Sequence, residues 1–379
     1  MALVVVVSGV ALVLDKLWLD AAQLELNTAV EAAALSSGRA LVSDDLLRGP
    51  TDNTVRLEQA RHFAADLAAK NRIAGQPVAL DPSPEGSIRF GKLVYREDIR
   101  ETVFVETTDV PTTVVVTGEH SHTTNNPVAL FWQGIAGVNY GNVFARSEAS
   151  IDNHVAGFRP IEGVPVPVLP LAILKQPHPD ANGETTVDDW ETQIEKREGE
   201  DLWRVDPVTH RSVQVADGIP EITLRTIGND GDTQNVNAYF FVLDPQATLS
   251  DFEQHLTRGW LPQDFKSFPI PELRLDQGPL SFQTLNSSGG NLANVLQAHQ
   301  GECRIVFLFD QCEGGKLVCS GVVAGRIMSA NSAGEGACQI VFQPGVLTTR
   351  TAILVNETLV PLAHAASANK YVYKLHLTF

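Results

Sequence analysis

Residues 1–40 read MALVVVVSGVALVLDKLWLDAAQLELNTAVEAAALSSGRA, an apolar run that continues into a segment of strong helix formers. No charged side chain occurs before Asp15. Apolar or small residues then recur three or four positions apart, at Leu17, Ala21, Leu24, Thr28, Ala32 and Leu35. Alanine and leucine favour helix, and a period near 3.6 is typical of one helical face. The stretch therefore predicts one continuous helix over residues 1–40.

The uncharged start of this helix is compatible with a membrane anchor, a signal peptide or a buried strand. A helix reaching only to Asp15 spans about 21 Å, less than the roughly 30 Å of a hydrocarbon core. Extended to Leu19, with Asp15 and Lys16 reaching outward and Trp18 at headgroup depth, it would just span. No basic residue precedes the run and no turn follows it, which disfavours a signal peptide and a strand. We expect a single-pass anchor that includes Leu3, Val7, Val10, Leu14 and Trp18.

Small residues gather in the second half of the same helix. Gly, Ala, Ser and Thr at a helix surface allow a neighbouring helix to approach closely. We expect Ala29, Ala32 and Ala33 to form a packing face for the helix of a partner protein.

The charge of the chain excludes some partners. The formal net charge is −17, and no basic cluster occurs that would displace counterions from nucleic acid. An anionic membrane surface would be repelled for the same reason. Between His178 and Asp206 there are ten carboxylates and three basic residues. A solvated linker or helix face is the plain interpretation of this stretch, and a cation-binding or partner-docking segment is the alternative.

The remainder of the chain predicts an α+β fold that is mainly β. The 379 residues exceed a usual single domain, and residues 57–71 predict an amphipathic helix. Alternating, β-rich runs follow at 87–94, 102–108, 112–120, 142–151 and 221–227, and strands return in the last eighty residues. Five prolines between 163 and 183 suggest an extended connector. We expect an anchor over 1–40, an α+β domain over 41–158, a Pro-rich and acidic linker over 159–200 and a mainly β domain over 201–379.

All four cysteines lie near the C-terminus, at Cys303, Cys312, Cys319 and Cys338. If residues 304–311 and 316–323 form a hairpin around EGGK, Cys312 and Cys319 flank its turn and could pair. Cys303 with Cys338 would then close the larger loop. Free buried thiols remain an alternative, and a zinc site is a weaker one because no close CxxC pair exists.

Several motifs suggest chemistry that their context does not support. GSIRFGK (86–92) resembles part of a phosphate-binding loop, but Leu93 replaces the magnesium-binding Ser or Thr and the segment predicts a strand. EHSH presents His120 and His122 without a third metal ligand. DANGE at Asp180 and NDGD at Asn229 lack the remaining ligands of a calcium loop. No hydrolase elbow is present, so we expect no catalytic, cofactor-binding or metal-binding residues and no small-molecule substrate.

The order of segments resembles TadG-like proteins of the Flp/Tad (tight adherence) pilus system. The apolar span is followed by Asp15, Lys16, Gln23 and Asn27 and by the alanine-rich helix, and the blocks 57–94 and 114–151 match the family's next segments. The resemblance implies a non-enzymatic, single-pass protein of the bacterial inner membrane with an extracytoplasmic body. Its implied partners are pilus-assembly or pilin-like membrane proteins. The upstream Arg-rich segment of the family is missing, which suggests a truncated anchor or a start assigned too far downstream.

Two functions from other classes stay open at this stage. One is an envelope-associated, hydrolase-like enzyme whose active site no motif reveals, which a deep pocket with perturbed carboxylates or histidines would favour. The other is a cell-surface structural protein unrelated to pili. Within the pilus interpretation, Val128–Trp132 is the loop best suited to dock on a partner, with burial in the core as the alternative.

Overall fold

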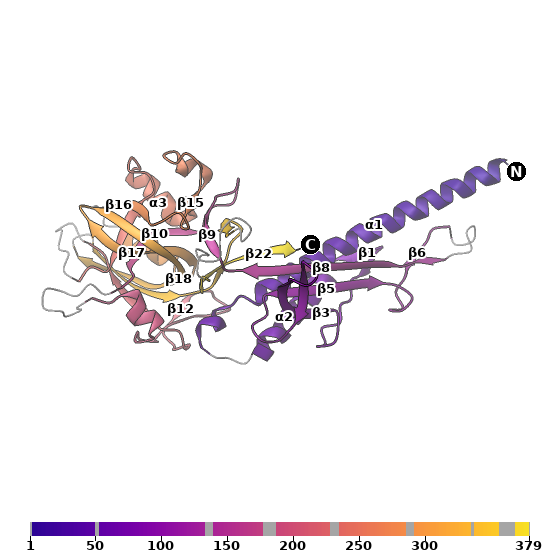
Figure 1. Cartoon of the computed structure of the whole chain (residues 1–379), viewed down its shortest axis with the longest axis horizontal. Helices are drawn as coiled ribbons and strands as arrows, with labels where there is room; N and C mark the ends of the chain where they lie inside the picture. Colours follow the sequence, from indigo (N-terminus) through magenta and orange to yellow (C-terminus); the bar gives the residue numbers. More distant parts are fainter. Residues whose placement is uncertain are drawn as a thin grey trace. The chain divides into compact units, whose positions relative to one another are not determined.

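The computed structural model describes residues 2–49, 53–132, 139–176, 187–227, 235–285, 292–334, 337–355 and 368–378, with the side chains of 2–5 and 334 left out (Figure 1). The fold is mainly β with a long N-terminal helix, as the sequence predicted. The chain forms two compact units. Unit 1 comprises Met1–Val42, Asp52–Ile151 and Leu375–Phe379, and unit 2 comprises Ser43–Thr51 and Asp152–Lys374.

Unit 1 combines two helices with an antiparallel sheet. The helices are α1 (Ala2–Ala40) and α2 (Asn53–Ala69). The sheet runs in the order β8 (Val143–Asp152), β5 (Thr113–His120), β3 (Ile88–Arg96), β4 (Glu101–Glu106), and Leu375–Thr378 of β22 (Val372–Thr378) continue it beside β8. Two small pairs complete the unit, β1 (Arg72–Ile73) with β2 (Gln76–Pro77) and β6 (Val128–Ala129) with β7 (Tyr140–Gly141).

The predicted long helix is confirmed, but its buried face differs from the expected one. The buried residues of its second half are Ala22, Leu26, Ala29, Val30, Ala33, Ala34 and Ser37. The predicted stripe faces outward instead, with Leu17 58% and Leu24 67% exposed. A Cβ added at Gly118 of β5 would lie 2.6 Å from the Val30 side chain. The sheet therefore selects the helix face that allows the closest approach.

The alanine face needs a second correction. Ala29 and Ala33 are fully buried within unit 1, where α1 contacts β5 and α2, so neither is available to the helix of a partner. Ala32 is half-buried. The second helix, α2, also packs on β3, where the Arg61 guanidinium lies 5.1 Å from the centre of the Phe90 ring. The small residues do allow close packing, but it occurs within the chain.

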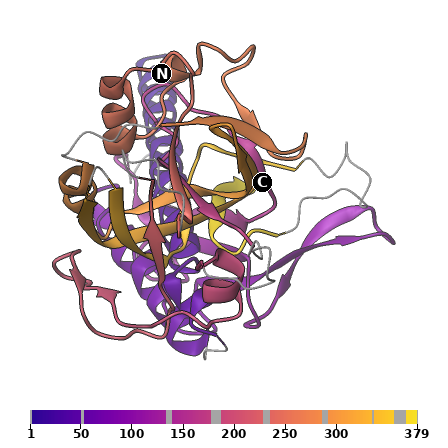
Figure 2. The same ribbon diagram turned by 90° about the vertical axis from the view of Figure 1, so that its left-hand side faces the viewer.

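Unit 2 contains a closed ring of strands (Figure 2). In ring order these are β10 (Val168–Leu174), β14 (Ala238–Val242), β16 (Leu280–Thr284), β18 (Lys316–Gly334) and β17 (Cys303–Glu313), and β17 pairs with β10 in parallel to close it. β19 (Ala337–Pro344) pairs with the second half of β18, and β13 (Ile222–Arg225) pairs with β19. Closure leaves these ring strands without a free edge for pairing with other chains.

Aromatic side chains fill much of the core of unit 2. The rings of Phe241 and Phe282 stack at 4.4 Å, and Phe307 meets Phe282 at 5.1 Å. Trp260 is fully buried against the same group, 6.0 Å from Phe307. Such pairs add about 0.5–1.5 kcal/mol each beyond area burial.

Helices and shorter strands complete unit 2. The α-helices are α3 (Leu249–Arg258) and α4 (Leu292–Ala298), with the short helical turns η1 (Asp44–Leu47), η2 (Glu191–Glu195) and η3 (Pro262–Phe265). The shorter strands are β9 (Val155–Phe158), β11 (Arg204–Val205), β12 (Ser212–Val213), β15 (Leu273–Arg274), β20 (Leu347–Thr348) and β21 (Ala352–Leu354).

The expected linker over 159–200 contains a central strand. β10 is buried along its whole length and lies between β14 and β17. The pairing of β10 with β17 shifts register between Val168 and Ala172, the interval that contains Pro170. Proline cannot donate to a ladder, and an irregularity of this kind accommodates it. The proline-rich sequence therefore hid a core strand, and the expected boundary at 159 is replaced by one near Ile151.

Gly259 offers a test of how α3 is joined to this core. It ends α3 with φ +77°, and its Cβ position lies 2.2 Å from the Val166 carbonyl oxygen, because Trp260 and Val166 exchange main-chain hydrogen bonds. We expect Gly259→Ala to lower the free energy of unfolding by roughly 3 kcal/mol, from backbone strain and this clash. Gly278 also has a positive φ but no atom near its Cβ position. Gly278→Ala should cost about 1 kcal/mol in urea unfolding, and equal losses would contradict the account.

Candidate functional site

The N-terminal half of α1 exposes apolar side chains around most of its circumference. The exposed residues are Val6, Val7, Val10, Leu12, Val13, Leu14 and Leu17, each at least 44% exposed. At 100° per residue they cover an arc of about 220°. This arc is wider than the apolar stripe of about 100° that a surface helix usually buries against its own protein. This segment is the largest group of exposed apolar side chains among the described residues.

Asp15 and Trp18 join α1 to the loop that follows β6. The Asp15 carboxylate is 6% exposed and accepts hydrogen bonds from the main-chain N–H groups of Phe131 (2.9 Å) and Trp132 (3.4 Å). Trp18 Nε1 donates to the Ala129 carbonyl oxygen (3.1 Å), and its ring lies 5.0 Å from that of Phe131. Asp15 was expected to reach toward solvent. It is instead a buried acceptor that positions a loop, while Lys16 pairs with Asp20 at 2.6 Å on the exposed side.

A shallow apolar groove of about 520 Å³ results from this contact. Its lining residues are Leu14, Leu17, Trp18, Ala21, Phe131 and Trp132. Within the predicted docking loop, Val128 and Leu130 are buried, whereas Phe131 is 66% and Trp132 39% exposed. Burial in the core therefore applies to Val128 and Leu130, and docking of the exposed Phe131 and Trp132 on a partner stays a prediction.

The expected anchor residues fall mostly on the exposed apolar surface of the N-terminal half of α1. Val7, Val10 and Leu14 are exposed and Trp18 is half-buried, whereas the side chain of Leu3 lies outside the described residues. Within the part of the chain that the structure describes, no helix combines the length and the apolar character needed to cross a membrane.

A second candidate site is a polar cavity of about 500 Å³ in unit 2. Its charged lining residues are Asp188, Glu198, Glu200, Glu221 and Arg225. Burial raises the pKa of Asp188 above its usual range and raises that of Glu221 to about 7. A pocket with perturbed carboxyl groups is what the enzyme alternative requires, so the contacts of Glu221 decide how the cavity is interpreted.

Both oxygens of Glu221 are already engaged by donors of unit 2. They accept from the main-chain N–H groups of Leu202 (2.8 Å) and Trp203 (3.1 Å) and from Gln343 Nε2 (3.0 Å). Gln343 is 1% exposed and also donates to the Trp203 carbonyl oxygen at 2.9 Å. Glu221 therefore fastens the segment around Leu202 to β19. Its geometry is that of a structural carboxyl group: burial raises its pKa, and these three donors partly oppose that rise.

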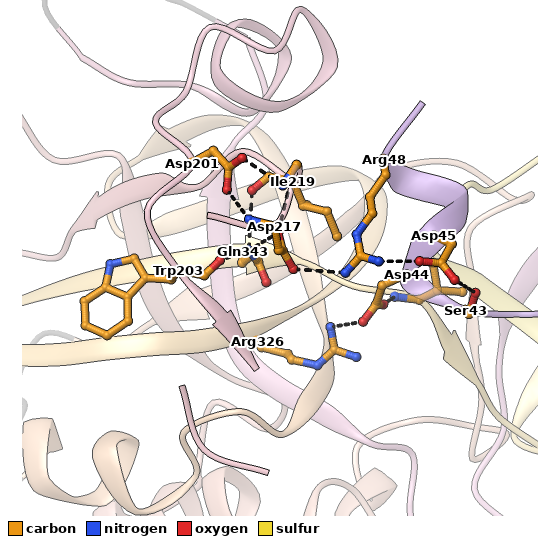
Figure 3. Close-up of polar contacts among 12 residues, drawn as sticks. Ser43, Asp44, Asp45, Arg48, Asp201, Trp203, Asp217, Ile219, Arg326 and Gln343 are labelled. Atoms are coloured by element: carbon orange, nitrogen blue, oxygen red, sulfur yellow. Dashed lines mark hydrogen bonds and ion pairs between the residues drawn. The ribbon is translucent and has the colours of Figure 1, made fainter. Parts of the chain in front are cut away.

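The same network continues to the segment Ser43–Thr51 (Figure 3). Arg48 forms ion pairs with Asp45 and with Asp217, the latter at 3.3 Å. Arg326 pairs with Asp44 at 2.8 Å. Asp201 accepts from the main-chain N–H groups of Asp217 (2.9 Å) and Gly218 (2.8 Å). These contacts hold η1 and the acidic segment on unit 2. Within the acidic stretch, Asp201 is thus a partly buried acceptor, whereas Asp188, Glu198 and Glu200 are exposed, as a solvated face predicts.

The cysteines occupy three strands of unit 2, and all four are free thiols in this structure. The predicted hairpin around EGGK is confirmed, since Glu313 pairs with Lys316. Cys312 opposes Leu317 and Cys319 opposes Phe309, so Cys312 and Cys319 are diagonal neighbours on one face, and their pairing stays a prediction.

The expected pairing of Cys303 with Cys338 does not fit the strand register. Cys303 opposes Arg326, which in turn opposes Gln343, five residues along β19 from Cys338. At about 3.3 Å per residue this offset alone is about 17 Å, far beyond disulfide reach.

The remaining motifs can be placed in part. GSIRFGK lies largely on β3, as predicted. His120 is buried and His122 exposed, so they do not form a pair of ligands. DANGE (180–184) and NDGD (229–232) both lie outside the described residues. Among the described residues, no group of three or more His, Cys, Asp or Glu side chains is placed to hold a metal ion.

Glu221 predicts a specific pH dependence. Its pKa is raised from 4.5 to about 7 in the folded protein, so folding retains a proton that the unfolded chain releases. The contribution of Glu221 to stability is therefore greatest below about pH 4.5 and falls by up to about 3 kcal/mol as the pH rises to about 7. Relative to wild type, Glu221→Gln should gain stability over this window in urea unfolding. Glu198→Gln, an exposed residue at the same cavity, should not, and parallel profiles for both variants would contradict the assignment.

Comparisons with known proteins add no assignment to these two sites. No protein-family model, curated protein or solved structure was found to match this chain.

Proposed function

We propose that this protein is a non-enzymatic component of an Flp/Tad pilus assembly or secretion system. In this proposal α1 holds it in the inner membrane, its remaining residues are extracytoplasmic, and it acts through contacts with pilin-like or other pilus-assembly proteins. The observation that carries the proposal is the exposed apolar half of α1, from Val6 to Leu17.

The character of α1 changes where unit 1 begins to cover it. Exposed residues before Asp15 are nearly all apolar, whereas Lys16, Asp20 and Glu25 are charged and exposed. A charged side chain near the middle of a bilayer costs about 2.5–3.5 kcal/mol, so a boundary of this kind separates the lipid-facing part of a helix from its water-facing part. The boundary coincides with the contact between Asp15 and the Phe131–Trp132 loop.

The outer face of α1 beyond the boundary supports the role in protein contacts. Leu24 is 67% exposed, and Ala21 and Thr28 are exposed beside it at helical spacing. This short apolar stripe is suited to the groove of a neighbouring helix. We therefore propose that this stripe, and not the buried Ala29 and Ala33, is the surface that faces a partner.

The enzyme alternative loses support from the contacts of Glu221. The one carboxyl group of the cavity with a pKa near neutrality has each oxygen bound to donors of the protein itself. A general acid or base needs an oxygen free to reach the substrate. We therefore favour a binding protein over a hydrolase.

Membrane association is tested by placing charge on the apolar helix. The double variant Val10→Lys with Val13→Lys should move the full-length protein from the membrane fraction of cells to the soluble fraction. A lysine opposes insertion by up to about 2.5–3.5 kcal/mol at the centre of a membrane helix, and position 10 lies farther from the Asp15 boundary than position 13. Val208→Lys alters a residue that is 84% exposed in unit 2 and should leave fractionation unchanged. Equal membrane recovery of the double variant and wild type would contradict the anchor.

Pilus partnership is tested by photo-crosslinking from the outer stripe. A photoreactive residue at Leu24 should capture a pilin or another component of the pilus system, identified by mass spectrometry. The same residue at Leu26, which is fully buried, should capture none. Capture only of proteins from outside such a system, or of nothing, would count against the pilus assignment.

A further inference from the structure

Four aromatic side chains lie on or beside α1 at the boundary between its apolar and polar halves. We define this aromatic collar as Trp18, Phe131, Trp132 and Tyr140. Tyr140 is 43% exposed and lies on β7 opposite Ala129, the residue whose carbonyl oxygen accepts from Trp18 Nε1. Trp18, Phe131 and Trp132 line the groove beside this stretch of the helix, and the Tyr140 ring, on the adjoining strand pair, lies 5.6 Å from that of His122. Three of the four residues belong to a different part of the sequence from α1.

The collar spans little distance along the helix. Asp15 and Trp18 fix its height on one side, and a Cβ added at Gly141 would lie 2.4 Å from the Leu19 side chain on the other. The stretch from Asp15 to Leu19 rises about 6 Å. A bilayer of about 40–45 Å with a 30 Å hydrocarbon core leaves roughly 5–8 Å of interface in each leaflet. The collar and the interface therefore match in thickness.

The chemistry of the collar also matches that interface. Trp and Tyr combine an apolar ring with a polar group and are enriched where hydrocarbon meets headgroups. On one side of the collar the exposed side chains of α1 are nearly all apolar, and on the other they include the charged Asp20 and Glu25. The Lys16–Asp20 ion pair lies at this height and is exposed.

We infer that the aromatic collar lies in the headgroup interface of a phospholipid bilayer, so that Phe131, Trp132 and Tyr140 form a second membrane contact beside α1. This inference rests on the proposed anchoring by α1. Asp15 is a positioning residue for the collar, since its carboxylate holds the Phe131 and Trp132 main chain and leaves their rings exposed. The net charge of −17 makes zwitterionic lipid the favoured surface.

The test uses full-length protein in phosphatidylcholine vesicles whose acyl chains carry bromine either near the headgroup or near the terminal methyl. Flotation of the protein with the vesicles measures anchoring, and quenching of tryptophan fluorescence measures depth. Shallow bromine should quench more than deep bromine. Trp132→Phe should remove roughly half of the shallow quenching, because Trp18 and Trp132 are the two tryptophans of the collar. Trp203→Phe in unit 2 should leave the quenching unchanged.

Asp15→Ala separates positioning from anchoring. It should float with vesicles as wild type does, while shallow quenching of Trp132 falls, and the exposed Asp20→Ala should change neither. Flotation with equal quenching in wild type and Trp132→Phe would overturn the inference without contradicting the membrane anchor. In that case the collar would contact protein and not lipid. Absence of flotation would instead refute the anchoring on which the inference rests.

Discussion

The close approach of α1 to β5 is the constraint on which unit 1 depends. Gly118 has no side chain, and a Cβ there would lie 2.6 Å from Val30 and 3.0 Å from Leu26. Only a helix face with small or well-fitted residues can lie at this distance, so the sheet takes the side that carries Ala22, Leu26 and Ala33. The opposite side is left with exposed Leu17 and Leu24. The absence of a side chain at Gly118 therefore determines which apolar residues of α1 stay exposed to other molecules.

Unit 2 depends on closure instead. Its strands return through β17 to β10, and the core they share contains stacked aromatic rings. Around this ring, Glu221 and Gln343 bind main-chain groups of an otherwise irregular segment. Buried polar groups with satisfied partners specify one arrangement of such loops, where apolar packing alone would permit several.

Local patterns in the sequence predicted the elements but not their partners. The long helix, the alternating strands of unit 1 and the EGGK hairpin follow from period and turn chemistry, which neighbouring residues determine. The buried face of α1 could not be predicted, because alanines occur on several of its sides. The face that packs on the sheet is set by the close approach that Gly118 allows, and Gly118 is far from α1 in the sequence. β10 was hidden because prolines that lie before and within a strand look like a connector, and only the register shift near Pro170 shows how the strand tolerates one.

The candidate site was predicted in its parts and missed in its assembly. Val7, Val10, Leu14, Trp18 and the Val128–Trp132 loop were each identified from the sequence, and the contact between Asp15 and the loop was not. It joins residues more than one hundred positions apart. A lone aspartate at the end of an apolar run was the available signal, since a charge in that position needs a partner.

The path of β22 has a consequence for how the molecule is made. Its residues up to Lys374 belong to unit 2, and those from Leu375 onward belong to unit 1, where Thr378 binds Ser150 and Glu148 of β8. During synthesis α1 leaves the ribosome before unit 2 does, whereas Leu375–Thr378, which complete the sheet of unit 1, leave after it. The N-terminal unit can therefore reach its final sheet only after the whole C-terminal unit has been translated.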